Sequence, residues 1–180
     1  MRILNSAPPG APPLSPANPA VVNANVSTAQ VFPAPSNTAV AAILQGLGTS
    51  RLDGRQFIVR ASGSVISNGN YNVTVTLYSG TSLTAASNTI LKESTARNVN
   101  AATAGWFLEG RFSVDSKSGI LAGTVALCIN NLYDAHAVVT NTISSINVVT
   151  EPPFNMVVGM TFSSADAANF GYMNEFVLGR

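Results

Sequence analysis

Charged residues are scarce in this chain of 180 residues: they make up 9% of it, against about 25% in an average soluble domain. Nine basic and eight acidic residues leave a formal net charge of +1, so the composition provides no electrostatic basis for binding nucleic acid. A surface with so few charges keeps a concentrated monomer in solution poorly. The composition therefore favours a structural or binding protein that works packed against a partner.

Cysteine and histidine are nearly absent, with Cys128 and His136 the single residue of each kind. One cysteine excludes an internal disulfide framework and a multi-cysteine zinc site, and no G-x-S-x-G motif for a serine nucleophile occurs. Glu109 and Asp115 would lie about 20 Å apart on a straight strand, beyond the roughly 5–10 Å that glycosidases use. We expect no enzymatic activity, no metal site and no cofactor.

Long hydrophobic runs are also missing. The N-terminal residues have too few apolar side chains before the first prolines to make the run of about 7–15 residues that a signal peptide needs. No stretch approaches the roughly 18 apolar residues of a membrane-spanning helix. The sequence predicts a protein without a membrane partner that folds in a cytoplasm, where Cys128 stays reduced.

Proline is confined almost entirely to one end of the chain: eight of the ten prolines lie before residue 36, and residues 36–151 contain none. This distribution predicts three parts: an extended Pro/Ala/Asn-rich arm (1–36), a connecting segment (37–54) and a folded domain (55–180). The arm buries too little apolar surface to fold alone, and it favours polyproline II. It is either a disordered tail or an arm that orders against a neighbouring subunit while residues 37–180 fold without it. In the second interpretation its spaced apolar side chains form a partner interface: Leu14, Val21, Val22, Val26, Val31 and Phe32.

The folded domain alternates polar and apolar residues with a period of two, which is typical of half-buried strands. Residues 37–48 are ambiguous between a short helix and a strand. Eight or nine short strands with turn residues between them predict an all-β fold, an antiparallel β-sandwich of jelly-roll type. The expected strands cover residues 57–66, 71–78, 89–93, 105–114, 120–130, 135–142, 144–150, 154–163 and 172–178.

One of these strands predicts both a core face and an exposed face. Trp106, Leu108 and Phe112 share the side expected to be buried, which leaves Phe107 exposed and available to a partner. Glu109 and Arg111 lie two residues apart on the exposed side, close enough for an ion pair. Cys128 falls on the small-residue side of the following strand, where we expect a packed structural cysteine.

Three segments resemble small β-sandwich structural proteins of tailed phages: Leu52–Gly63, Leu77–Ser82 and Trp106–Phe112. The resemblance implies a virion protein that is made in the host cytoplasm and decorates the capsid surface as a cement protein. It also implies a homo-dimer or homo-trimer that bridges subunits of the major capsid protein. The alternative is a receptor- or glycan-binding module of a phage tail fibre, spike or baseplate.

Overall fold

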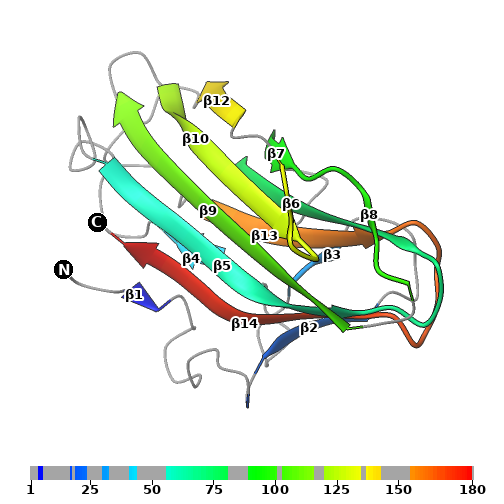
Figure 1. Cartoon of the computed structure of the whole chain (residues 1–180). Coiled ribbons are helices and arrows are strands. Elements are labelled where there is room, and N and C mark those ends of the chain that lie inside the picture. The colour runs from blue at the N-terminus through cyan, green and yellow to red at the C-terminus, as the bar shows by residue number, and fades with distance from the viewer. Residues whose placement is uncertain are drawn as a thin grey trace.

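The computed structural model describes residues 4–5, 17, 19–23, 30–32, 41–43, 56–80, 89–100, 103–115, 120–134, 137–142 and 155–179. All regular elements in these ranges are β-strands, and every pairing between them is antiparallel. The strands form two sheets that face each other across one hydrophobic core (Figure 1). The predicted antiparallel β-sandwich is therefore confirmed. Within the described ranges, no helix is long and apolar enough to cross a membrane.

The larger sheet has eight strands in the order β1-β14-β5-β9-β10-β11, with β2 also paired to β14 and β12 also paired to β10. Their bounds are β1 Leu4–Asn5, β2 Ala20–Asn23, β5 Gln56–Ile66, β9 Thr103–Asp115, β10 Ile120–Ile129, β11 Leu132–Tyr133, β12 Ala137–Thr142 and β14 Phe170–Gly179.

The smaller sheet has six strands in the order β3-β13-β6-β7, with β4 also paired to β13 and β8 to β6. Their bounds are β3 Gln30–Val31, β4 Ala41–Ile43, β6 Asn72–Gly80, β7 Thr89–Glu93, β8 Arg97–Asn98 and β13 Asn155–Phe162. The ambiguous segment 37–48 thus contains a strand, β4, because its backbone pairs with β13. The strand expected at 144–150 lies outside the described residues.

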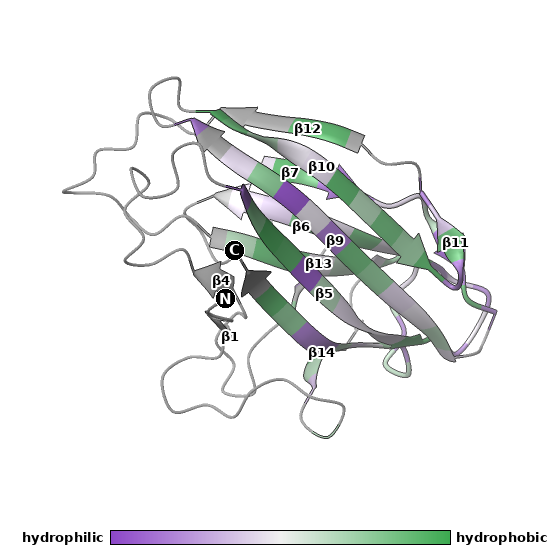
Figure 2. Ribbon diagram, turned by 60° about the vertical axis from the view of Figure 1, so that its left-hand side comes forward, coloured by the Kyte–Doolittle hydropathy of each residue, from purple (hydrophilic) through white to green (hydrophobic). Residues whose placement is uncertain are grey.

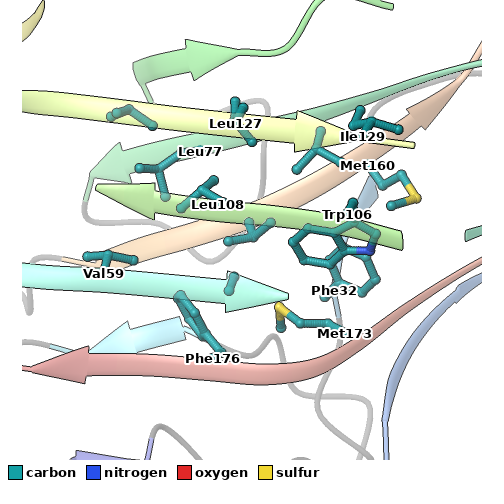
Figure 3. Close-up of a cluster of buried hydrophobic side chains, with 14 of the residues drawn as sticks. Phe32, Val59, Leu77, Trp106, Leu108, Leu127, Ile129, Met160, Met173 and Phe176 are labelled. Atoms are coloured by element: carbon teal, nitrogen blue, oxygen red, sulfur yellow. The ribbon is translucent and has the colours of Figure 1, made fainter. Parts of the chain in front are cut away.

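The alternation of side chains on β9 places its faces as the sequence predicts. Trp106, Leu108 and Phe112 are buried, whereas the Phe107 side chain between them is 36% exposed. The buried face of β9 contacts side chains from both sheets (Figure 3). Phe112 stacks on Phe57 of the neighbouring strand, with ring centroids 5.6 Å apart. Because successive side chains of a strand point to opposite faces, burial of one set leaves the other set facing solvent.

A β-bulge in β14 gives the buried Trp106 its hydrogen-bond partner. The register of β14 against β5 shifts between Met173 and Glu175, and the Trp106 Nε1–H donates to the carbonyl oxygen of Tyr172 at 3.0 Å. Gly63 faces this carbonyl, and a Cβ atom at position 63 would collide with it. A glycine is thus required where the bulge turns a backbone carbonyl toward the core.

The N-terminal region belongs to the sandwich, which corrects the predicted division at residue 55. The strands β1 and β2 pair with β14, and β3 and β4 pair with β13. The Phe32 N–H also donates to the carbonyl oxygen of Val158 at 3.1 Å, and the Phe32 ring stacks on Trp106 with centroids 5.6 Å apart (Figure 3). Proline has no N–H to donate to a ladder, and each of these four strands lies in a stretch without proline.

Candidate interaction surfaces

The solvent-facing side of the larger sheet, here called the outer face, combines small, apolar and charged side chains. Its residues alternate with the core residues of β5, β9, β10 and β14, and Arg60, Glu109, Arg111 and Glu175 are among its charged members. Figure 2 shows isolated hydrophilic positions on β5, β9 and β14. The outer face comprises Ile58, Arg60, Ser62, Ser64, Phe107, Glu109, Arg111, Ser113, Ala122, Thr124, Ala126, Cys128, Glu175 and Val177.

Two arginines share one carboxylate at the centre of the outer face. The Arg60 Nε–H donates to Glu109 Oε2 at 2.7 Å, and the Arg111 Nε–H donates to Glu109 Oε1 at 3.0 Å. The Arg111 guanidinium is the largest influence that holds the pKa of Glu109 below its ordinary value; burial opposes it, and Arg60 adds to the lowering. The predicted pair of Glu109 with Arg111 is confirmed. Three of the charged side chains of the outer face are thus already paired with one another within the sheet.

Exposed apolar side chains continue the outer face to the β10 edge of the sheet. Tyr133 lies opposite Cys128 in the register and is 73% exposed, and Val138 lies opposite Thr124 and is 82% exposed. With Phe107 they form an apolar set on one side of the molecule. The sequence pattern alone does not place Tyr133 and Val138 here, because only the pairing of β11 and β12 with β10 brings their side chains to this side.

The cysteine of the outer face is buried although its neighbours on that face are not. Cys128 lies beside Phe107 in the register and is a free thiol. The expectation of a packed structural cysteine is confirmed. His136, the single histidine of the chain, lies outside the described residues.

The predicted arm interface divides into three groups in the structure. Val22 and Phe32 are core residues of their own sandwich, with Phe32 0% exposed, which corrects the expectation that they lie on a surface for a partner. The reason is that β2 pairs with β14 and β3 pairs with β13 of the same chain, which brings these side chains into its core. Val21 is exposed. Leu14 and Val26 lie outside the described residues, and the structure describes Val31 by its backbone alone.

Asp134, which follows β11 of the larger sheet, forms hydrogen bonds with residues in and next to β8 of the smaller sheet. Its Oδ1 accepts a hydrogen bond from Arg97 Nη2 at 2.9 Å, and its Oδ2 accepts one from the Thr95 backbone N–H at 2.7 Å. Burial alone would raise the pKa of Asp134, but the bonds from Thr95 and the charge of Arg97 outweigh it and lower the pKa. The carboxylate form is therefore the one that fits the fold.

Replacing Asp134 with Asn is expected to make stability less dependent on pH in the acid range. A carboxyl with a lowered pKa in the folded state stabilises the fold above its unfolded pKa of about 3.9, and this stabilisation is lost as pH falls through the folded pKa. Wild type should therefore exceed D134N in free energy of unfolding near pH 7, and the difference should shrink below about pH 4. Urea unfolding at a series of pH values measures this. A difference that stays constant down to pH 2 would contradict it.

The part of the chain that the structure describes contains no group of three or more His, Cys, Asp or Glu side chains that could hold a metal ion. No protein-family model matches the chain, and no curated protein is significantly similar to it.

Proposed function

We propose that this protein is a structural component of a tailed-phage particle, a decoration protein that binds the outside of the head. In this role it stabilises the shell by bridging neighbouring subunits of the major capsid protein, and it acts without catalysis. The observation that carries the proposal is the outer face, where small and apolar side chains surround the paired Arg60, Glu109 and Arg111. The low charge of the whole chain and the resemblance of three segments to phage β-sandwich proteins support it.

The outer face suits a contact dominated by apolar burial. Phe107, Tyr133 and Val138 are exposed on one side of the sheet, and burying such surface contributes about 25 cal/mol per Å² before the ordering costs of binding. The paired Arg60, Glu109 and Arg111 add little to affinity, because exposed ion pairs are worth about 0–1 kcal/mol each. One copy would bind modestly. A dimer or trimer would bind more tightly, because several contacts are then made at once.

Attachment to the particle is expected to survive high salt. At about 1 M NaCl the Debye length is about 3 Å, so contacts between charges are weakened while apolar burial is retained. The measurement is to wash purified particles that carry the protein in about 1 M NaCl and to quantify the copies that remain. Release of most copies by salt alone would contradict a contact held by apolar burial.

Replacing Phe107 or Val138 with Ser is expected to weaken attachment by about tenfold or more, because each loses apolar surface at the contact. The matched control is Ile90→Ser, which changes an apolar side chain that is 54% exposed on β7 of the other sheet. Affinity of the purified variants for particles stripped of the protein measures the effect. Equal binding by all three variants and wild type would exclude the outer face as the contact.

The alternative role is a receptor- or glycan-binding module of a tail fibre, spike or baseplate. Location and copy number separate the two roles: several hundred copies distributed over the head support decoration, whereas a few tens of copies or fewer at the tail support the alternative. Quantitative mass spectrometry of particles, with labelled antibody in electron micrographs, gives both numbers. Absence of the protein from purified particles would overturn both.

A further inference from the structure

The first 43 residues supply four short strands that close one side of the sandwich. The strands β1 and β2 lie along β14, and β3 and β4 lie along β13 (Figure 1). Each is only two to four residues long, yet this segment also places Ala20, Val22 and Phe32 in the core. We call residues 1–43 the donor segment. Without it, β13 and β14 would each lose their pairing on one side, and Trp106 would lose the ring stacked on it.

The donor segment depends on an acceptor for its structure. In the described residues its four strands pair with β13 or β14 and none pairs with another strand of the segment. Eight prolines lie in it, and proline has no N–H with which to extend a ladder. The part of the segment that the structure describes therefore has no core of its own. Its apolar side chains need the edge formed by β13 and β14 of some copy.

The chain that follows the donor segment is long enough to reach a second molecule. The strand β4 ends at Ile43 and β5 begins at Gln56. The intervening residues 44–55 can span up to roughly 40 Å when extended. That span is comparable with the diameter of a domain of 180 residues, whose radius of gyration is about 16 Å. The β13–β14 edge of an adjoining copy is thus within reach.

We propose that the donor segment exchanges between copies, so that residues 1–43 of one chain complete the sandwich of another. Phe32 of one copy then stacks on Trp106 of the second, and β2 pairs with the second copy's β14. Val22 and Phe32 remain core residues in either arrangement, and the contacts are the same in both. The balance between closed and exchanged forms is therefore set by the local concentration of neighbours and by the geometry of residues 44–55.

Exchange gives the chain a way to link copies without a large surface interface. On a particle, where neighbouring copies are held close together, exchange is favoured over the closed form; this clause alone rests on the proposed function. Exchange itself is a property of the purified protein, so it can be tested without any particle.

The test uses two full-length chains, each with Cys128→Ser so that no native thiol interferes. One chain carries Val21→Cys and the other carries Tyr172→Cys, which are register partners across β2 and β14. The two chains are unfolded, refolded together at high concentration and oxidised. A disulfide between them forms from the exchanged arrangement, since the two partners reside on different chains. We expect a disulfide-linked dimer on a non-reducing gel, increasing with protein concentration.

The matched control pair is Ser62→Cys on one chain and Phe107→Cys on the other. These residues are register partners across β5 and β9, both outside the donor segment, so they report accidental collision between chains. A second exchange pair, Asn23→Cys with Phe170→Cys, repeats the measurement at the next position on the same side of β2 and β14. Single chains that carry both cysteines of a pair report closure within one molecule.

The proposal is overturned if neither exchange pair yields more linked dimer than the control pair at any concentration. A dimer from either exchange pair, well above the control, supports it. Because the readout is taken on purified protein, exchange can succeed while the decoration role fails, or fail while that role stands. The two outcomes are therefore distinguishable.

Discussion

Replacing Phe32 with Ala is expected to lower the free energy of unfolding by about 3–5 kcal/mol, the range for removing a buried aromatic ring. The ring is 0% exposed and stacks on Trp106 with centroids 5.6 Å apart. It also lies against Gly171 of β14, where an added Cβ would come within 3.3 Å of it. Strands on both sides of the core therefore line the cavity that Phe32→Ala leaves, and β13 and β14 cannot close it without shifting the sheets.

The matched control for Phe32→Ala is Val21→Ala, which changes an exposed side chain in the same donor segment and should cost no more than about 0.5 kcal/mol. Urea unfolding followed by tryptophan fluorescence reports both, because Trp106 is the only tryptophan. Deletion of residues 1–36 should be at least as harmful as Phe32→Ala, contrary to the expectation that residues 37–180 fold alone. A cost below about 1 kcal/mol for Phe32→Ala would place the donor segment outside the core.

Replacing Gly63 with Ala is expected to destabilise the protein by roughly 2–6 kcal/mol. The new methyl group would collide with the Tyr172 carbonyl oxygen, and overpacking of this kind costs about 1–3 kcal/mol. Moving that carbonyl would also break its hydrogen bond from the buried Trp106 Nε1–H, and a buried donor left without a partner costs a further 1–3 kcal/mol or so. The two effects add because both follow from one displacement of β14.

Gly105→Ala is the matched control for Gly63→Ala, since both glycines lie within strands of the larger sheet and Gly105 is the register partner of Ser64, next to Gly63. A Cβ at position 105 meets its nearest neighbour at 4.0 Å, so it fits without movement. The urea midpoints of the two variants measure their stability, and the NMR signal of the Trp106 indole N–H reports whether its hydrogen bond is kept. Equal stability of the two variants, with an unchanged indole signal, would contradict the role of Gly63.

The same bulge organises the edge to which the donor segment binds. The strand β2 pairs with Phe170–Met173, before the bulge, and β1 pairs with residues 177–178, after it. Gly63 and Trp106 hold the bulge in place from the core side. The core therefore determines how β14 presents its free edge, whichever copy supplies the donor segment.

Features that depend on neighbours along the chain could be predicted from the sequence. Alternation with a period of two is a local property of a strand, so it predicted the buried Trp106 and Phe112 and the exposed Phe107. The pair of Glu109 with Arg111 was predictable for the same reason, because residues two apart share a face. The single cysteine in a strand of small residues predicted a buried structural thiol.

Features that depend on which strands become neighbours were decided by the tertiary structure alone. The composition of residues 1–36 predicts that they do not fold by themselves, and the structure is compatible with this. Only the structure shows that short strands from these residues pair with β13 and β14 and so complete the sandwich. The bond from Arg60 to Glu109 and the placement of Val138 on the outer face follow from registers between strands far apart in sequence. Hydrophobic patterning determines the two faces of each strand, whereas pairing and register are determined by packing across the whole core.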